Sequence, residues 1–428
     1  MKTLGLDNLR HNRFVTGERV RVYSIISIVL MVLTCVLLLV TSEGNLAYDG
    51  KPIGTDFSNV YAAGIMANEG EAARVWDWQA HFAVQNRIHG DALQAFYGWH
   101  YPPFFLLVAA ALAALPYLWS LAVWNVAGFA FYACIMARIV GRIRGWLLPV
   151  IAFPAIFVNI SHGHNGFLTA GLFGLSFLFL DKRPWLAGIF IGLLAYKPQF
   201  GVLIPLALLV GGYYRTFLSA SVTVISLGAI VTLVYGWEIW PAFFESLELT
   251  RNVILEQGVT GWHKIQSVFS VVMLWTGSLT LAYLLQGILT LVVLVVAIIA
   301  FRFPSAIEDR AALIITGALL ATPYALDYDL VVLAPVIGFL TVRGLREGFA
   351  DWEALALVLI WFCPLLTRPV MMFSGIPLAF MAMLFLYVIV TKRVIGNLRQ
   401  EAGETSGTAL QNDHAGADLA KKGHNGIE

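Results

Sequence analysis

Apolar residues occur in long stretches that are separated by short polar turns. A helix that crosses a membrane perpendicularly needs about 20 such residues. Several stretches are shorter and adjoin Pro or Gly, which indicates broken or tilted helices around a cavity. The pattern predicts an all-α polytopic membrane protein with about 12 transmembrane helices. The predicted spans are residues 22–41, 119–138, 146–160, 166–180, 184–196, 198–212, 216–235, 279–301, 311–325, 328–342, 353–367 and 372–391.

The composition of the chain agrees with a lipid environment. Hydrophobic residues make up 59% of the 428 positions and charged residues only 12%, whereas about 25% of a typical soluble domain is charged. The net charge of +1 provides no electrostatic footprint for nucleic acid. The three cysteines (Cys35, Cys134 and Cys363) lie far apart inside apolar runs, so they predict neither a disulfide framework nor a metal cluster.

The Lys and Arg residues of the short loops orient the predicted spans. All these basic loops fall on the cytoplasmic side if segments 101–115 and 265–275 do not cross the membrane, so we expect both to be interfacial or re-entrant helices. The basic N-terminus and the apolar run after it resemble a signal peptide, but the run is too long for one and predicts an uncleaved first span. The loop residues are Arg138, Arg142, Arg144, Lys182, Arg183, Arg215, Arg302, Arg310, Arg343, Arg346, Lys392 and Arg393.

This topology divides the chain into three parts. Residues 1–21 form a cytoplasmic N-terminus, residues 22–398 a transmembrane domain, and residues 399–428 a polar tail that we expect to be disordered in the cytoplasm. Two long outer loops, 42–118 and 236–278, contain aromatic residues suited to the headgroup layer and are expected to hold interfacial helices. The predicted location is the cell inner (plasma) membrane, with both termini cytoplasmic.

Polar residues that could bind a ligand or take part in catalysis lie at the predicted outer ends of the spans, whereas the inner ends carry ordinary Lys and Arg anchors. Carboxylates, imidazoles, amides and ammonium groups at one membrane level indicate a functional site. We expect that site on the periplasmic or extracytoplasmic face. The candidates are Asp56, His100, Tyr101, His162, His164, Asn165, Lys197, Gln199, His263, Lys264, Gln266, Tyr324, Asp327, Asp329 and Arg368.

Two of these residues have simpler explanations than function. Asp56 precedes a predicted helix, so it is either an N-cap or a catalytic carboxylate. Lys197 lies between two short apolar segments beside Pro198, so its ammonium is expected at the outer rim or in a wet cavity. There it either snorkels to the interface or serves as a counter-ion for a phosphate.

The sequence provides little support for a metal or nucleotide cofactor. His162 and His164 can chelate, but spacing defines no third ligand. Residues 327–329 read Asp-Tyr-Asp, like the Asp-x-Asp pattern that holds metals in soluble nucleotide-sugar enzymes, yet no nucleotide-binding domain accompanies it; a polar turn is the plainer role. No P-loop, dinucleotide fingerprint or nucleophile elbow occurs. We therefore expect no cofactor, and a divalent metal is left open.

Six segments in order resemble glycosyltransferase family 87, the polyprenol-phosphate-sugar-dependent enzymes of GT-C architecture, which include mannosyltransferases. One departure is His164, where the family is expected to have glutamine. The resemblance spans roughly residues 20–395, and its six segments are 54–64 (GTDFSNVYAAG), 101–105 (YPPFF), 164–170 (HNGFLTA), 181–199 (DKRPWLAGIFIGLLAYKPQ), 263–270 (HKIQSVFS) and 327–335 (DYDLVVLAP).

The resemblance implies an inverting transfer of mannose or a similar sugar from a polyprenyl-phosphate donor to a lipid or glycan acceptor. It implies that Asp56 is the general base. Lys197, Lys264 or His263 would stabilise the departing phosphate, and Tyr101 and Tyr324 would stack on the sugar or the prenyl chain. The implied partners are the lipid-linked donor, a glycolipid or glycan acceptor and the bilayer.

Two other classes of function remain open at this point. A secondary transporter or lipid-linked-sugar flippase would also have about twelve spans, but such proteins place charges near the midplane and often contain two related halves. A membrane scaffold would not need polar residues gathered on one side.

Overall fold

The computed structural model describes residues 6–90, 93 and 95–398, and these are almost entirely helical. Within the described part of the chain the only β-type pairings are isolated bridges, such as Ile265 with Leu326. The predicted all-α class is therefore confirmed. The predicted cytoplasmic tail, 399–428, lies outside the described residues.

Among the described residues, seven helices are long and apolar enough to cross a membrane, so the chain is a membrane protein. Helices of 21 to 24 residues extend about 30–36 Å, which matches the hydrocarbon core of a bilayer. The seven are α2 (Gly17–Val40), α6 (Tyr117–Val140), α12 (Tyr214–Tyr235), α15 (Leu279–Arg302), the continuous helix Asp327–Glu347 made of η7 (Asp327–Val332) and α17 (Leu333–Glu347), α18 (Glu353–Ser374), and the final helix Leu378–Leu398.

The other predicted spans are shorter helices, so the prediction of about 12 crossings is not confirmed. Prolines begin several of them, because proline is tolerated in the first turn of a helix but interrupts its interior. These shorter elements are α7 (Leu147–Ile151), α8 (Pro154–His162), α9 (Gly166–Phe179), α10 (Pro184–Leu193), η3 (Leu194–Tyr196), η4 (Pro198–Phe200), α11 (Ile204–Val210) and α16 (Ile307–Ala321).

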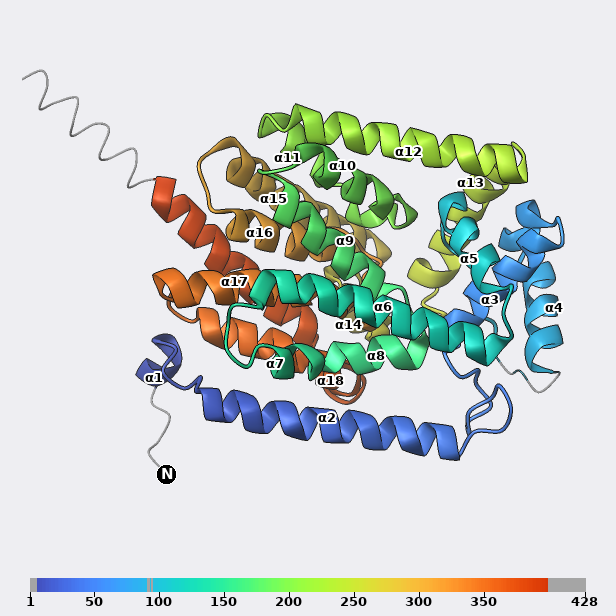
Figure 1. Ribbon diagram of the computed structural model, residues 1–428, viewed down its shortest axis with the longest axis horizontal. Helices are drawn as coiled ribbons and strands as arrows, with labels where there is room; N and C mark the ends of the chain where they lie inside the picture. Colours follow the sequence, from blue (N-terminus) through green and yellow to red (C-terminus); the bar gives the residue numbers. More distant parts are fainter. Residues whose placement is uncertain (1–5, 91–92, 94, 399–428) are drawn as a thin grey trace, which may run out of the picture.

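The helices of the two long loops gather at one end of the bundle, whereas α1 (Leu6–Arg10) lies at the other end (Figure 1). The segments 101–115 and 265–275 each contain a helix of fewer than ten residues, too short to span a bilayer. The elements of this end are α3 (Thr55–Asn68), η1 (Ala72–Trp76), α4 (Trp78–His89), η2 (Pro103–Phe105), α5 (Leu106–Leu112), α13 (Ile239–Thr250), η5 (Arg251–Glu256), η6 (Trp262–Lys264) and α14 (Val268–Thr276).

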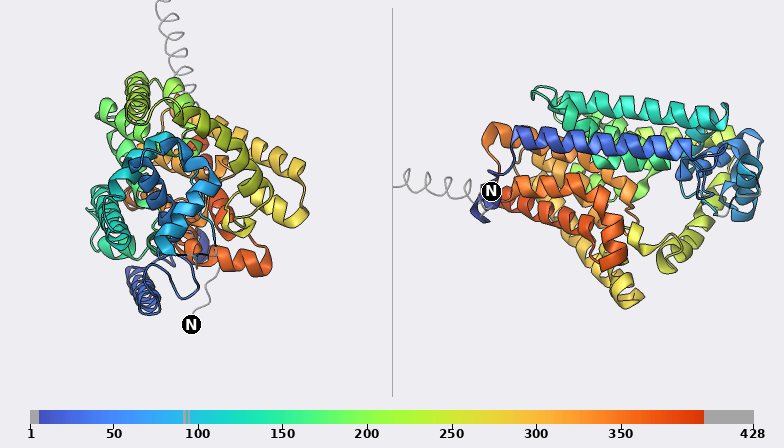
Figure 2. Two further views of the ribbon diagram at one scale, coloured as in Figure 1. Left: turned by 90° about the vertical axis from the view of Figure 1, so that its right-hand side faces the viewer. Right: turned by 90° about the horizontal axis from the view of Figure 1, so that it is seen from below.

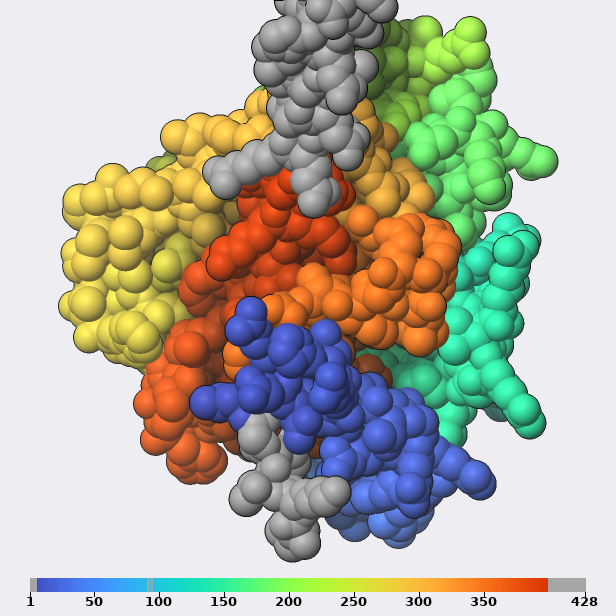
Figure 3. Space-filling model, turned by 90° about the vertical axis from the view of Figure 1, so that its left-hand side faces the viewer, coloured from blue at the N-terminus to red at the C-terminus, as the bar shows by residue number. Residues whose placement is uncertain are grey.

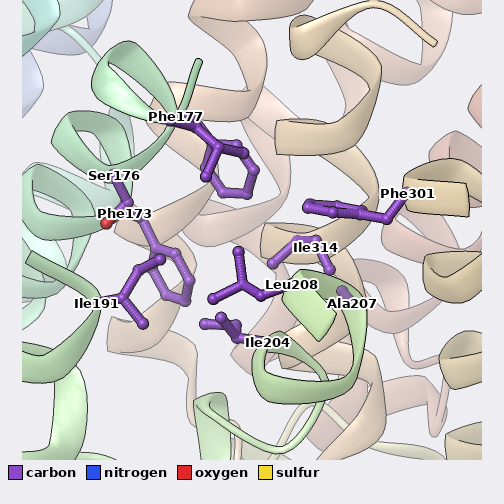
Figure 4. A pocket seen from close by; sticks show the side chains of 10 residues that line it. Phe173, Ser176, Phe177, Ile191, Ile204, Ala207, Leu208, Phe301 and Ile314 are labelled. Carbon is purple, nitrogen blue, oxygen red and sulfur yellow. The ribbon is translucent and has the colours of Figure 1, made fainter. Parts of the chain in front are cut away.

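The centre of the bundle is formed by α9 and α16, which neighbouring helices enclose (Figures 1 and 2). In contrast, α2 leaves most of its Leu, Val and Ile side chains exposed, as a helix facing lipid does. Side chains of α9, α10, α11, α15 and α16 converge around a void of only about 10 Å³ (Figure 4). A void of that size holds about one water at most, so the centre is closely packed.

A network of buried charges joins four helices at the end of the bundle that contains α1. The fully buried Asp309 of α16 is ion-paired with Arg343 of α17 and with Arg393 of the final helix. Arg393 also binds Glu353 of α18, with Nη1 2.7 Å from Oε1. Because a buried charge is stable only with a partner, these contacts hold the four helix ends together.

We expect Asp309→Asn to destabilise the fold strongly, by about 3–5 kcal/mol, because it leaves two buried guanidinium groups under-compensated. Thermal unfolding of the protein purified in detergent measures the effect. Glu347→Gln is the matched control, since Glu347 is 44% exposed in its ion pairs with Arg343 and Arg346 and should cost no more than about 1 kcal/mol. Equal losses for the two variants would contradict the network's role.

Candidate active site

The conformation of Gly54 determines how α3 begins. Gly54 is the N-cap of α3 in the left-handed region (φ 72°), and α3 has no side-chain cap. A Cβ at position 54 would lie 2.8 Å from the side chain of Leu121, so glycine is needed for both its φ and its size. Asp56 lies in the first turn. The N-cap explanation for Asp56 is therefore wrong, and its carboxylate is available for another role.

Close packing holds α3, and with it Asp56, against α5. A Cβ on Gly64 of α3 would lie 2.0 Å from the carbonyl oxygen of Ala109 in α5, so the two helices approach as only glycine permits. On the neighbouring face Phe57 and Tyr61 pack against Tyr117, with ring centroids 5.6 and 5.2 Å away. The first turn of α3 is thus rigidly placed.

One oxygen of Asp56 is buried and has no hydrogen-bond partner among the residues that the structure describes. This atom, Oδ2, lies 3.8 Å from Nδ1 of His162, and the side chain as a whole is 22% exposed. Nδ1 of His162 is in turn 2.6 Å from the hydroxyl of Thr55. Burial raises the pKa of Asp56, opposed chiefly by charge on His162 and also by Lys264 and Arg368. A buried oxygen without a partner is ready to accept a hydrogen bond from a ligand.

The loop after α8 adds further unpaired polar groups. The loop turns at Gly163, the left-handed C-cap of α8, and His164 then stacks on Tyr328 with ring centroids 3.7 Å apart. Nε2 of His164 lies 3.3 Å from the hydroxyl of Tyr101. Asn165 is buried, and neither its amide oxygen nor its amide nitrogen has a partner within the described chain. These groups suit the hydroxyls of a sugar.

The two aspartates of the Asp-Tyr-Asp motif neutralise two different cations. Oδ2 of Asp327 lies 2.6 Å from Nε of Arg368 on α18, and Oδ1 of Asp329 accepts a 2.6 Å hydrogen bond from Nζ of Lys197. Because each carboxylate is committed to its own cation, the motif does not present a joint pair of carboxylates to a metal.

Lys197 is not at a wet rim, as its position beside Pro198 had led us to expect. Its side chain and that of Asp329 are each only 3% exposed. A lysine at this depth must be neutralised rather than solvated, so the ammonium is committed to Asp329 in this structure.

A short extended pairing brings Lys264 to the same region. Ile265 pairs with Leu326, and the backbone N–H of Gln266 donates to the carbonyl of Ala325 over 2.6 Å. η6 therefore lies beside the Asp-Tyr-Asp motif. Burial lowers the pKa of Lys264, as does the positive charge of Arg368, whereas Asp327 and Asp56 raise it. His263 precedes it, and burial likewise lowers the pKa of His263.

Four candidate residues make their contacts elsewhere. Nδ1 of His100 is 3.0 Å from the hydroxyl of Thr250 on α13. The amide oxygen of Gln266 accepts from Thr367 over 2.7 Å. Tyr324 packs against the small apolar cluster around Phe269, and Gln199 is half-buried. None of these contacts joins the four residues to Asp56.

The sequence had drawn attention to Arg368 without assigning it a role. Its signal was a charged residue in an apolar stretch, directly after the predicted span 353–367. In the structure its guanidinium lies beside Asp327, is 33% exposed, and acts on the pKa of Asp56, Lys264 and His263. Arg368 is thus part of the charged cluster.

The fold and the site define a helical membrane protein with a cluster of charged and imidazole side chains at one end of its bundle. The sequence model of glycosyltransferase family 87 matches residues 99–323, and the chain belongs to this family. It is therefore an enzyme, a glycosyltransferase. This finding favours the enzyme interpretation over a transporter or a scaffold. No curated protein and no solved structure matches the chain significantly. The matched range does not include Asp56, Asp327, Asp329 or Arg368.

The Lys197–Asp329 pair yields a stability prediction. Lys197→Met and Asp329→Asn should each destabilise the protein by about 3–5 kcal/mol, because each leaves one buried charge without a partner. The double variant should recover much of that loss. Membrane abundance and thermal unfolding measure it. Stable single variants that lose only turnover would show instead that Lys197 acts on substrate.

Proposed function

We propose that this family 87 enzyme transfers mannose or a similar sugar from a polyprenyl-phosphate donor to a hydroxyl of a lipid or glycan acceptor. The transfer is a single inverting displacement with Asp56 as general base. The observation that carries the proposal is the buried, unpartnered Oδ2 of Asp56, within range of the charges of Lys264 and Arg368. A base, a cationic region and unpaired sugar-binding groups are what such a transfer requires.

Asp56 removes the proton of the acceptor hydroxyl as that oxygen attacks the sugar. A general base works best when its pKa approaches the operating pH, and burial moves the pKa of Asp56 in that direction. His162, 3.8 Å away, and Thr55 hold the surroundings of the carboxylate in place.

Arg368 and Lys264 stabilise the departing polyprenyl phosphate as negative charge builds on its bridging oxygen. Arg368 suits this role because its planar guanidinium can bind a phosphate through two hydrogen bonds, and a third of its side chain is exposed. His263 lies next to Lys264 in the chain and is a further donor. Lys197 is a positioning residue in this scheme, since its ion pair holds Asp329 in η7.

The sugar is bound between these charges by the polar groups around His164. The unpaired amide of Asn165 and the hydroxyl of Tyr101 are suited to its hydroxyl groups, and the rings of Tyr101 and Tyr328 provide flat surfaces beside it. In the transition state the sugar has oxocarbenium character, as in glycoside hydrolysis, so nearby carboxylate charge is favourable.

The same geometry supports a proposed location for the site. The helices of the loops 42–118 and 236–278 lie at the end of the bundle opposite α1 (Figure 1), while the exposed Arg142 and Arg144 follow α6 at the end near α1. By the positive-inside rule we place the active site at the extracytoplasmic face of the plasma membrane. Residues 22–398 then form the catalytic domain, and the donor arrives within the outer leaflet.

Replacement of Asp56 by Asn tests the proposal directly. We expect Asp56→Asn to lower product formation by about 10²–10⁴-fold, measured by mass spectrometry of lipid products after incubation with a panel of polyprenyl-phosphate sugars. Because the pKa of Asp56 is higher in the folded protein than in the unfolded chain, its ionisation destabilises the fold at neutral pH. The variant should therefore unfold at a temperature no lower than the wild type.

The matched control is Glu69→Gln, which removes an exposed carboxylate of the same loop that is paired with Arg87. This variant should retain wild-type turnover. Wild-type turnover in Asp56→Asn would show that Asp56 is not the general base.

The pH dependence of kcat/KM provides a second test. Asp56 acts only when ionised, so kcat/KM should rise with pH, with a midpoint above the 3.8 of an unperturbed aspartate. The charge of Lys264 opposes that rise in pKa, so Lys264→Gln should move the midpoint to higher pH. Arg74→Gln, which changes an exposed pair of the same outer loop, should leave the midpoint in place. An unshifted midpoint in Lys264→Gln would show that the charge of Lys264 does not act on the pKa of Asp56.

A further inference from the structure

A large cavity lies between the first half of α2 and the rest of the bundle. Its volume is about 650 Å³, and its walls come from α2, α6, α7, α17 and α18. Residues 14–24 line it, whereas the other end of α2, at Val40, leads toward the loop with Asp56. Because α2 extends about 36 Å, the cavity and the candidate active site belong to opposite leaflets.

The walls of the cavity are almost entirely hydrocarbon and aromatic surface. Tyr132 and Met136 of α6, Phe153 before α8, and Leu357 and Trp361 of α18 are among them. α2 packs mainly on α7 and α8 and runs along the edge of the molecule (Figure 1), so the cavity adjoins the bilayer. Its volume lies in the range of ligand sites, and its apolar walls at membrane depth fit hydrocarbon chains.

Two hydroxyl groups face this cavity without partners. Ser24 of α2 lines the wall, is only 1% exposed, and forms no hydrogen bond within the described residues. Thr341 of α17 lines the cavity as well, and its hydroxyl likewise has no partner in the described part of the chain. Ser24 is buried and Thr341 is half-buried, and both hydroxyls line the cavity, where they can donate to an occupant with hydrogen-bond acceptors.

The mouth of the cavity is basic. Arg19 lines it and donates a 2.8 Å hydrogen bond to the carbonyl of Phe14. Arg142 and Arg144 flank Ile143, which also lines it. All three arginines are exposed, and none forms an ion pair among the described residues. In Figure 3 this end of the molecule faces the viewer, with the blue N-terminal segment beside the orange residues around 350.

We propose that this cavity binds an anionic phospholipid of the cytoplasmic leaflet. The phosphate lies against Arg19, Arg142 and Arg144, the ester carbonyls accept from Ser24 and Thr341, and the acyl chains fill the apolar interior. Basic pockets between transmembrane helices on the cytoplasmic side bind such headgroups. The site does not depend on the chemistry at Asp56.

Native mass spectrometry of the full-length protein in detergent tests the proposal, with phosphatidylglycerol and phosphatidylcholine of identical acyl chains as probes. We expect phosphatidylglycerol to bind at least tenfold more tightly, and each arginine replaced by alanine to weaken it about fivefold. Equal binding of the two lipids would overturn the proposal.

Two variants and one control locate the site. Arg19→Ala combined with Arg142→Ala should reduce the preference for phosphatidylglycerol, and Leu357→Trp, which fills the cavity, should reduce binding of both lipids. Arg138→Ala is the matched control, because Arg138 is exposed on α6 at the same end but neither lines the cavity, as Arg19 does, nor adjoins a lining residue in the chain, as Arg142 does. If the arginine variant and the control behave alike, the proposed site is wrong.

The wild-type protein provides a measurement that no folding defect can obscure. Photoactivatable phosphatidylglycerol in nanodiscs should label peptides that contain residues 14–24 or 354–362. Labelling confined to segments that do not line the cavity would overturn the proposal, as would recovery of a prenyl lipid instead of phospholipid from the labelled peptides.

Discussion

A charge buried in a membrane protein must have a partner, and this constraint organises both ends of the bundle. At the end with α1, Asp309 joins Arg343 and Arg393, and Arg393 also binds Glu353, so that four helices are tied together. At the other end, Asp327 and Asp329 neutralise Arg368 and Lys197. An isolated charge at either place would cost several kcal/mol, so these pairings determine how the helix ends meet.

At the end of the bundle opposite α1, paired polar groups have a structural role and unpaired ones are available to a ligand. Lys197 and Asp329 satisfy one another and are almost fully buried. Asp56, only a few ångströms from His162, keeps an oxygen free, and Asn165 keeps both amide atoms free. A protein tolerates such unsatisfied groups where a ligand completes them, which agrees with membership in a glycosyltransferase family.

The donor we propose is compatible with a chain whose described part is helical throughout its regular structure. A sugar carried on a lipid phosphate arrives within the leaflet, so the enzyme needs no nucleotide-binding domain. Short elements at the end opposite α1 form the site: α3 and α5 hold Asp56 through the close contact at Gly64, and the pairing of Ile265 with Leu326 brings Lys264 to the Asp-Tyr-Asp motif.

The sequence by itself determined the helical class, the positions of the apolar segments and the polar residues at their outer ends, because hydropathy and charge are local properties of a segment. It did not determine how many segments cross, since α9 and α16 are apolar because protein surrounds them. Only the tertiary structure decided that Lys197 is neutralised by Asp329, 132 residues away, and that Arg368 joins the site. Pairings between distant side chains depend on how helices pack, and no local pattern records them.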